Sequence, residues 1–569
     1  MVVIGDRNPT TKGRGLMNKV QRTLALALAL VLVAGLLVAC GSTPAASTAP
    51  STAPSSAPTE KSAAPSESAE QSETPQEVVT ITYMVMDPSW KPRNWGDDPG
   101  TRQMTEKSGT AINFIVPSGD ATEKANAMLV ANDYPEMMNL GRGTAYMKYI
   151  AAGAWHAYDD LWAQYGDTMM RSYMPDPVYK LNLEADGKLY IAPNWFSEDG
   201  FGANGDTLNI RNDIYEALGQ PEIKSLEDLK QVCLDLQADA AKYTLKAGKF
   251  TPMLITFGNG GKDPNWINKF CNLYGERAIS NRFIDTETNT VKFFTRSPHM
   301  VQALTYLNDI YAKGLLDPEA FTYNSETRGE AYAQGKPAFI WDAFWGMWTA
   351  NGTLQLDDPN VYYTSLETPY GTEGVKPMLN GYDTTGGGSN EITKNCKNTE
   401  AALKWASYYM SDEGNICSFY GAEGETMYYE NDDKTQPRLM PGVYEKKLAD
   451  WDNYGLTTGV RKLDLMQNQK WNWERHAESP DRAANRAIAA GSAFDGNLVR
   501  ILRLDSESEE GRIYAAAEPN IMAELTDIIT GPADQIESKL EAYNKALNEA
   551  GLEKVEAEWT RQYEDYSSR

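Results

Sequence analysis

Along residues 80–140, stretches in which hydrophobic and polar residues alternate are separated by stretches with helical spacing. This pattern predicts strands separated by helices. Residues 80–86 (TITYMVM) alternate and are rich in β-forming residues, so they predict an opening strand. The pattern then predicts a helix ending at Gly109, a strand over 111–116, a helix over 121–131 and a short strand over 137–140. This order is typical of an α/β lobe.

The same alternation continues along the chain, and helices crowd its C-terminal third. A Ser225 N-cap with Asp228 three residues later predicts the start of a helix with an apolar face. Trp195 and Phe196 are expected in an irregular stretch. Further elements are predicted as a hairpin arm over 187–193, strands over 208–211 and 337–341, and helices over 212–218, 298–314, 400–411 and 537–549.

The first 40 residues have the layout of a bacterial lipoprotein signal peptide. Basic residues precede an uncharged apolar run over 24–39, and the run ends in Leu-Val-Ala followed by Cys40. We therefore expect cleavage before Cys40 and attachment of a lipid such as palmitate to it. A transmembrane anchor is the alternative, although the run is short for a span of about 20 residues. Translation could start at Met1 or at Met17.

Residues 40–79 predict an acylated cysteine followed by a disordered tether. The segment is built mainly from Ser, Thr, Ala, Pro and Glu and contains no aromatic residue. Such a composition cannot bury enough apolar surface to offset its conformational entropy. The prolines keep it extended, so it can hold a folded body away from a lipid surface.

The remaining chain of about 490 residues is too long for a single hydrophobic core, so two or more lobes are expected. The full sequence has 78 acidic and 53 basic residues and a formal net charge of −25. An acidic surface argues against nucleic acid or anionic lipid as a partner.

Cysteine and histidine are too few and too scattered to predict a metal centre or a cofactor. Three histidines and the four cysteines after Cys40 form no zinc-ligand spacing. The cysteines are interpreted as small buried hydrophobic residues, and Cys396 with Cys417 is the pair favoured if a disulfide exists. A structural Ca²⁺ at Asp97-Asp98 or Asp432-Asp433 stays possible, but a solvated acidic surface is favoured. The cysteines are Cys233, Cys271, Cys396 and Cys417.

Motifs for catalysis are missing, whereas aromatic residues are plentiful. The sequence has no GxSxG, Walker or Rossmann glycine motif, and the glycine run 386–388 is interpreted as a tight crossing between lobes. With 14 Trp and 31 Tyr, several at predicted strand ends, an aromatic sugar-binding cleft is favoured. Core packing is the alternative for each Trp. The candidate ligand-binding residues are Trp90, Trp195, Trp341 and Trp345 for stacking, Asp87, Arg142 and Asn194 for hydrogen bonds, and Tyr382.

Several segments resemble the bacterial extracellular solute-binding proteins (family 1) of carbohydrate ABC transporters, particularly the long lipoprotein branch of Gram-positive bacteria. The similar segments, over about residues 80–567, are EKSGTAINF, ANDYPEMMNLG, DGKLYIAP, LNIRNDIYEALGQPEIKSLEDL, FYGAEGETMYYE and AGLEKVEAEWTRQYEDY. The chain departs from the family pattern at Ile214-Tyr215, where a Trp is usual, and at Pro135-Glu136, where Pro-Asp is usual.

The resemblance implies an α/β, two-lobed periplasmic-binding-protein-like fold with hinge crossings and a helix-rich C-terminal part. Lobe 1 is expected over 80–200 plus about 375–430, and lobe 2 over about 205–370 plus 435–569. The implied protein is a monomer on the extracellular face of the cell membrane that captures an oligosaccharide for a permease and performs no catalysis. A surface glycoside hydrolase or lyase, or a binder of another solute such as a peptide, is the alternative.

Overall fold

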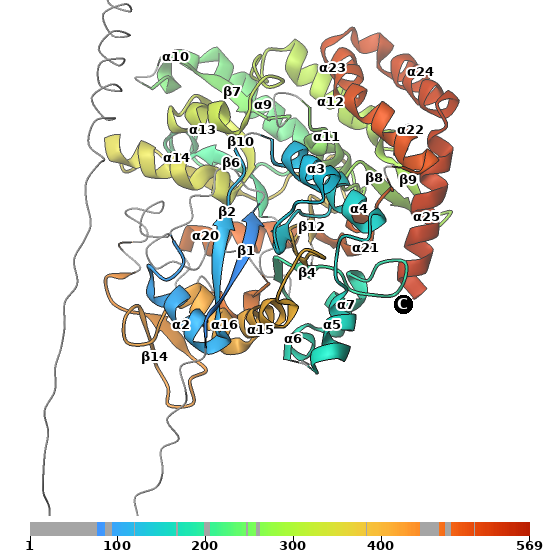
Figure 1. The fold of residues 1–569 in the computed structure, drawn as a ribbon. Helices are drawn as coiled ribbons and strands as arrows, with labels where there is room; N and C mark the ends of the chain where they lie inside the picture. The colour runs from blue at the N-terminus through green and yellow to red at the C-terminus, as the bar shows by residue number, and fades with distance from the viewer. Residues whose placement is uncertain are drawn as a thin grey trace, which may run out of the picture. The chain divides into compact units, whose positions relative to one another are not determined.

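The structure is a computed structural model of the 569-residue chain. It describes residues 77–85, 94–118, 120–166, 169–198, 205–245, 248–257, 262–382, 384–443, 446, 466–472, 480–505 and 507–568. The chain divides into two compact units, Met1–Glu73 and Thr74–Arg569, and every described residue belongs to the second. Within this second unit, two sheets with separate cores define two lobes (Figure 1).

Lobe 1 consists of the described residues of 77–198 and 384–472 and is built around a five-stranded sheet. The strand order is β2 (Thr110–Ile115), β1 (Val79–Val85), β3 (Met137–Asn139), β13 (Ser389–Ile392) and β4 (Ala192–Pro193). Strand β1 runs parallel to β2 and β3, and β13 runs antiparallel to β3 and β4. The helices of this lobe are α2 (Pro99–Ser108), α3 (Ala121–Ala131), α4 (Thr144–Ala151), α5 (Tyr158–Tyr165), α6 (Met169–Tyr173), α7 (Asp176–Leu181), α15 (Thr399–Met410) and α16 (Asp412–Tyr420).

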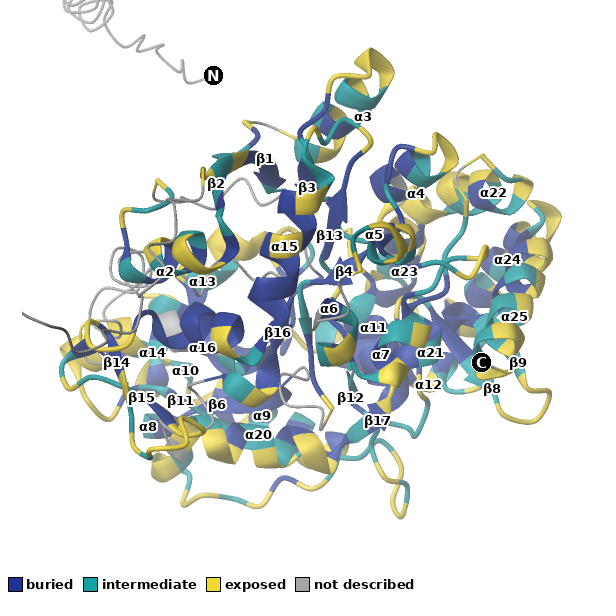
Figure 2. Ribbon diagram, turned by 60° about the horizontal axis from the view of Figure 1, so that its bottom comes forward, coloured by how far each residue is buried: buried dark blue, intermediate teal, exposed yellow. Residues whose placement is uncertain are grey.

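Both faces of the lobe 1 sheet are buried. Because successive side chains of a strand point to opposite faces, Tyr83 joins a core with Trp405 of α15, while Met84 joins a second core with Tyr146 and Tyr149 of α4. Most residues of α15 and α16 are buried (Figure 2). Next to α16 lies the hairpin of β14 (Met427–Tyr429) and β15 (Pro437–Leu439).

Lobe 2 consists of the described residues of 205–382 and 480–568 and is built around a four-stranded sheet. The strand order is β11 (Tyr363–Leu366), β6 (Asp206–Arg211), β10 (Pro337–Ala343) and β7 (Thr251–Leu254). Strand β10 is antiparallel to β6 and parallel to β7. Its helices before residue 380 are α8 (Asn212–Ala217), α9 (Leu226–Ala238), α10 (Ala240–Tyr243), α11 (Asn265–Asn272), η1 (Phe294–Arg296), α12 (Met300–Ala312), α13 (Ser325–Ala333) and α14 (Phe344–Asp357).

The C-terminal helices extend the core of lobe 2. Trp559 is buried in the same cluster as the strands of the lobe 2 sheet, and its ring contacts Tyr514 edge-on. Helix α25 (Leu552–Ser568) packs on the hairpin of β8 (Arg282–Asp285) and β9 (Thr290–Phe293). Strand β17 (Ala493–Asp495) pairs with β12 (Asn380–Tyr382). The other elements after residue 480 are α20 (Pro480–Gly491), α21 (Asn497–Arg500), α22 (Glu509–Ala517), η4 (Glu518–Asn520), α23 (Ile521–Thr530), η5 (Ala533–Gln535), α24 (Ile536–Glu549) and α25.

Helix starts follow the capping residues that the sequence carries. The predicted capping box at Ser225 and Asp228 is present, with Ser225 Oγ accepting a hydrogen bond from the Asp228 N–H at 3.1 Å. Asp98 caps α2 in the same way, and that helix ends at Gly109 with φ 69°. None of the described helices is both long and apolar enough to cross a membrane.

One predicted irregular stretch is a strand, and one boundary lies elsewhere than expected. Trp195 and Phe196 form β5, which pairs with β16 (Gln467–Asn468) in parallel. Because of this pairing, and because Met466 joins a lobe 1 core, residues 466–472 lie with lobe 1 rather than with lobe 2. A two-residue strand is too short to leave a periodic pattern in the sequence.

Candidate functional site

Between its described elements, the chain passes from one lobe to the other three times. The crossings run from β5 to β6, from β12 to β13 and from η3 (Gln469–Trp471) to α20. In lobe 1, the carboxyl ends of β1, β3 and β4 lie at the same edge as the amino end of β13. In lobe 2, the carboxyl ends of β7 and β10 lie with the amino end of β6. Ligands of α/β sheets bind beyond such carboxyl ends, so these edges form the candidate site.

Arg142 lies at the lobe 1 edge, three residues after β3, and contacts the second crossing. Its Nη2 donates a hydrogen bond to Thr385 Oγ1 at 2.6 Å and another to Asn182 Oδ1. Thr385 belongs to the crossing itself, and its backbone is bridged to Phe196 of β5. The sequence-predicted Arg142 is therefore half-buried at the point where two crossings lie side by side.

Asn194 and Trp195 lie under the glycine run of the second crossing. Asn194 Oδ1 accepts a hydrogen bond from the Gly388 N–H at 3.0 Å, and the Trp195 carbonyl accepts one from Gly386 at 2.8 Å. A Cβ on Gly386 would lie 2.0 Å from Asn194 Oδ1 and 2.5 Å from Trp195 Nε1, so only glycine fits there. Both predicted residues are half-buried at the hinge.

Tyr382 is the last residue of β12, at the lobe 2 end of the same crossing. Its carbonyl accepts a hydrogen bond from Gly496 at 3.1 Å, and it lies opposite Asp495 of β17 in register. Burial, followed by the nearby Asp495 carboxylate, raises the pKa of the phenol. Arg142, Asn194, Trp195 and Tyr382 thus lie at or beside the first two crossings, from β5 to β6 and from β12 to β13.

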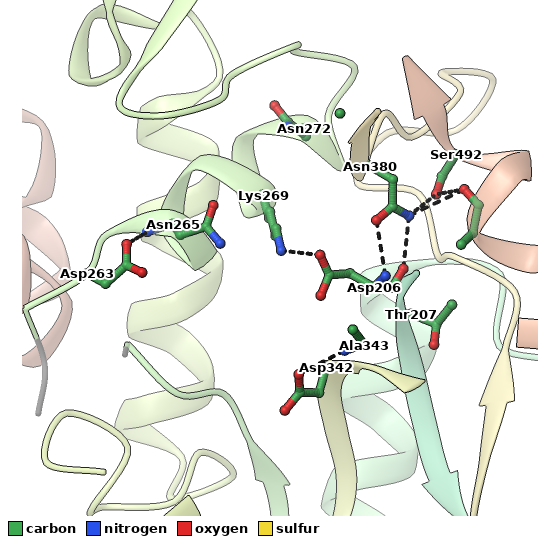
Figure 3. A network of polar contacts seen from close by, with 12 residues as sticks. Asp206, Thr207, Asp263, Asn265, Lys269, Asn272, Asp342, Ala343, Asn380 and Ser492 are labelled. Carbon is green, nitrogen blue, oxygen red and sulfur yellow. Dashed lines mark hydrogen bonds and ion pairs between the residues drawn. The ribbon is translucent and has the colours of Figure 1, made fainter. Parts of the chain in front are cut away.

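The lobe 2 edge carries a buried polar network that sequence reasoning missed (Figure 3). Lys269 of α11 forms an ion pair with Asp206, the first residue of β6, and its ammonium lies 4.3 Å from the Trp266 ring centroid. Asp342 of β10 accepts a hydrogen bond from the Ala343 N–H at 2.8 Å and faces Arg328 at 3.4 Å.

The Asp342 carboxyl is nine-tenths buried, and its surroundings favour the neutral form. Burial first, and then the negative charge of Asp206, raise its pKa, while Arg328 acts in the opposite direction. Strand register explains the closeness of the two acids, because Asp206 lies opposite Ala343 and Asp342 opposite Thr207. The pairing of β6 with β10, about 130 residues apart, brings the two acids together, and no local sequence pattern reveals it.

Trp341 lies in the core of lobe 2 and not at a ligand-facing surface. Its side chain is 0% exposed, with ring centroids 5.5 Å from Phe270 and 6.0 Å from Trp266. In this arrangement neither face of the ring is open for stacking. Every residue of β10 is buried, so this strand follows core packing rather than the predicted stacking.

Four candidate residues lie wholly or partly outside the described residues. Trp345 belongs to the first turn of α14, and its side chain lies outside the described residues. Asp87 and Trp90, in the loop after β1, and Cys40 also lie outside them. Their predicted roles stay predictions.

Metal-binding chemistry finds little support among the described residues. No three of their His, Cys, Asp or Glu side chains come together in a way that could hold a metal ion. Asp98 Oδ1 and Oδ2 accept hydrogen bonds from Thr101 at 2.8 and 2.7 Å, and Asp433 accepts one from Thr435 Oγ1 at 2.9 Å. Cys233, Cys271, Cys396 and Cys417 are free thiols, and all but the half-buried Cys396 are buried.

Two sequence comparisons cover parts of the chain. Residues 514–568 match a family model described as a domain of unknown function (DUF3502). A Niallia circulans protein described as "uncharacterized protein in butB 5'region" is 28% identical over 127 residues, which are 21% of this chain. The chain spans about half of that relative, since the match covers 47% of its length.

The similarity to solved structures extends over almost the whole second unit. The chain is similar to the alginate-binding protein AlgQ2 without calcium ion, with TM-score 0.66, 17% identity and coverage of 86% of this chain and 98% of that one. It is equally similar to the Streptococcus pneumoniae substrate-binding protein FusA in complex with kestose, with TM-score 0.66, 17% identity and coverage of 86% and 99%. An HMO-binding, ABC-transporter-associated solute-binding protein of Bifidobacterium longum infantis is also similar, with TM-score 0.66, 16% identity and coverage of 86% of this chain and 99% of that one.

These likenesses establish the fold. The chain has the two-lobed α/β fold of ABC-transporter solute-binding proteins, with a helix-rich C-terminal part, as the sequence resemblance predicted. The expected fold class is confirmed.

Proposed function

We propose that this chain is the solute-binding component of an ABC importer and that it captures a carbohydrate, an oligosaccharide, between its lobes. The observation that carries the proposal is that Arg142, Asn194, Trp195 and Tyr382 lie at or beside the first two crossings, from β5 to β6 and from β12 to β13. A ligand that touches both lobes there stabilises their closed arrangement, because only differential affinity shifts such an equilibrium.

The carbohydrate class is supported by the neighbours and by the residue types at the site. The similar structures are described as alginate-binding, as HMO-binding and as a complex with kestose. In this chain, Trp195 offers an apolar face for a sugar ring, and Arg142 and Asn194 offer hydrogen-bonding groups for hydroxyls. The proposed role is binding and delivery to a permease, without catalysis.

The proposal includes an anchor at the outer face of the cell membrane. The signal-peptide pattern ending at Cys40 and the proline-containing tether support it. A lipid on Cys40 would keep the diffusing body close to its permease. A Cys40→Ala chain should still bind its ligand in solution but should leave the cell unable to import it, and unchanged uptake of labelled ligand would contradict the anchoring role.

Calorimetry with a panel of oligosaccharides tests the binding function. The chain without residues 1–40 is titrated with fructo-oligosaccharides, milk oligosaccharides, alginate oligosaccharides and, as a different class, peptides. We expect saturable one-to-one binding of a carbohydrate, with the sugar recovered intact by chromatography. Binding only of a peptide would overturn the carbohydrate class, and new reducing ends would favour a hydrolase.

A matched pair of variants tests the position of the site. Trp195→Ala should weaken binding of the carbohydrate that the screen identifies by at least about tenfold, the size expected for an aromatic contact with a ligand. Tyr428→Ala removes an aromatic ring that is 41% exposed on the β14–β15 hairpin, and it should leave the affinity unchanged.

A further inference from the structure

An ion pair joins the two lobes outside the three crossings. Arg503, in the lobe 2 segment between α21 and α22, places Nη1 2.8 Å from Oε1 of Glu184 in lobe 1. The hydroxyl of Tyr146 donates a hydrogen bond to the same oxygen at 2.7 Å, and the guanidinium lies 5.4 Å from the Tyr146 ring centroid. The Arg503 and Glu184 side chains are 13% and 15% exposed, so salt screens this pair far less than a surface pair.

Each partner is fixed within its own lobe. The Glu184 N–H donates a hydrogen bond to the Lys188 carbonyl at 2.9 Å, at the base of a turn closed by the Leu183 and Leu189 bridge. The Arg503 backbone is held by a single side chain, Gln562 of α25. Gln562 Oε1 accepts from the Arg503 N–H at 2.9 Å, and its Nε2 donates to the Arg503 carbonyl at 2.5 Å.

Helix α25, which lies within the segment that matches the domain of unknown function, is anchored firmly in lobe 2. Glu556 Oε1 accepts a hydrogen bond from Phe293 N–H at 2.9 Å, and Thr560 Oγ1 accepts one from Val291 N–H at 3.0 Å. Trp559 is 1% exposed, with the Arg282 guanidinium 4.8 Å from its ring centroid. Helix α25 therefore fixes the position of Gln562, and Gln562 in turn fixes the backbone of Arg503.

Around the ion pair the two lobes are not tightly packed. Residues of both lobes line an open pocket of about 720 Å³, among them Trp155, Tyr190 and Glu184 of lobe 1 and Arg503, Glu558 and Tyr566 of lobe 2. A rotation about the crossings that separates the lobes here would stretch or break the bond between Arg503 and Glu184.

We propose that the C-terminal segment is an interlobe latch: α25, through Gln562, positions Arg503 so that its ion pair with Glu184 holds the lobes in the arrangement seen here. The segment that matches a domain of unknown function thereby acquires a role in setting the open–closed equilibrium. This role is independent of which ligand the protein takes, because both partners belong to the chain itself.

Pulsed electron–electron resonance on the ligand-free protein tests the latch. Nitroxide labels at Ala127→Cys in α3 and Gln355→Cys in α14, both exposed, report the separation of the lobes, with Cys396→Ser as background. A second label pair, Gln355→Cys and Lys545→Cys, lies within lobe 2 and must keep its distance distribution in every variant. Circular dichroism and thermal melting verify that each variant is folded.

We expect Arg503→Met and Glu184→Gln each to shift the interlobe distribution, with the ratio of the arrangements changing about fivefold or more, or about 1 kcal/mol. The double variant should add little to either single one, because both remove the same contact. Gln562→Ala, which keeps both charges, should shift the distribution in the same direction, and Arg503→Lys should shift it less than Arg503→Met.

Lys554→Met is the matched control. It removes an ion pair between α25 and Glu509 of α22, within lobe 2, and should leave the interlobe distances unchanged. Unchanged distributions in folded Arg503→Met and Glu184→Gln proteins would overturn the proposal. An equal shift in Lys554→Met would also overturn it, since the effect would then be general loosening of the C-terminal helices. Because no ligand is used, these outcomes are separate from success or failure of the carbohydrate screen.

Discussion

Asn380 holds Asp206 in the manner of a neighbouring strand, although the two residues are 174 positions apart. Asn380 Oδ1 accepts a hydrogen bond from the Asp206 N–H at 3.2 Å, and its Nδ2 donates to the Asp206 carbonyl at 2.9 Å. The same Nδ2 lies 3.2 Å from Ser492 Oγ, next to β17. One side chain therefore joins the lobe 2 ends of the first two crossings and the segment between α20 and β17 (Figure 3).

Asn380→Ala should lower the free energy of unfolding by about 1–3 kcal/mol, because it leaves the buried backbone groups of Asp206 without partners. Urea denaturation measures the loss. Asn520→Ala is the control, since that side chain is exposed on the C-terminal helices and makes one hydrogen bond, of 3.3 Å, to Ala516. Equal stability of the two variants would show that the Asp206 contact contributes little.

Gly386 and Gly387 form a second matched pair, adjacent in the crossing but opposite in surroundings. A Cβ at Gly386 collides with Asn194 and Trp195, whereas a Cβ at Gly387 meets nothing within 4 Å. Gly386→Ala should cost about 1–3 kcal/mol of stability and weaken ligand binding, because Asn194 and Trp195 must move. Gly387→Ala should stay within about 0.5 kcal/mol of the parent in the same denaturation experiment. The prediction fails if the two alanine variants behave alike.

The fold was largely predictable because its signals are local. Periodicity placed β1, β10 and α12 within two residues of their observed bounds, and the capping box at Ser225 placed the start of α9. Those signals depend on backbone geometry repeated over several residues. Strands β5 and β16, of two residues each, exist only because they pair with each other across 272 positions, and no local pattern encodes that pairing.

The site was only partly predictable because exposure and pairing are not local. The apolar run of β10 correctly predicted a buried strand, but it could not show that Trp341 points into the core. Lys269 and Asp206 are 63 positions apart, so their ion pair depends on where α11 packs against the end of β6. Arg142, Asn194 and Trp195 came from the rule that ligands bind at strand ends, which needs only the strand boundaries.

The buried Glu391 of β13 should make the stability of the protein depend on pH. Its side chain is fully buried, and burial raises its pKa to about 8, even though Leu140 N–H donates a hydrogen bond to it at 3.3 Å and Arg142 lies nearby. The folded protein thus keeps a proton that the unfolded chain releases near pH 4.5. The contribution of Glu391 to the free energy of unfolding is fully present at low pH and is lost as the pH rises from about 4.5 to 8.

Glu391→Gln should remove this fall. At pH 9 the variant should be more stable than the parent by an amount on the order of a few kcal/mol, because it no longer buries a charge, and at pH 4 the two should be alike. Thermal melting across this pH range measures the difference. Glu541→Gln, on the exposed side of α24, should follow the parent at every pH. If the melting temperatures of the parent and of Glu391→Gln changed in parallel with pH, the raised pKa of Glu391 would be contradicted.

Substitutions of Trp195 and Trp341 test the proposed ligand-binding role of the first against the core packing of the second. Trp341 is 0% exposed and packs against Phe270, so Trp341→Ala leaves a large cavity and should cost about 3–5 kcal/mol of stability. Trp195 is half-buried beside the glycine crossing, so Trp195→Ala should cost much less stability but most of the affinity for the carbohydrate identified by calorimetry. Denaturation and calorimetry on both variants separate the two effects. If Trp341→Ala remained folded, stable and unable to bind, the ring would reach the ligand in another arrangement of the lobes, and the stacking role predicted from the sequence would hold after all.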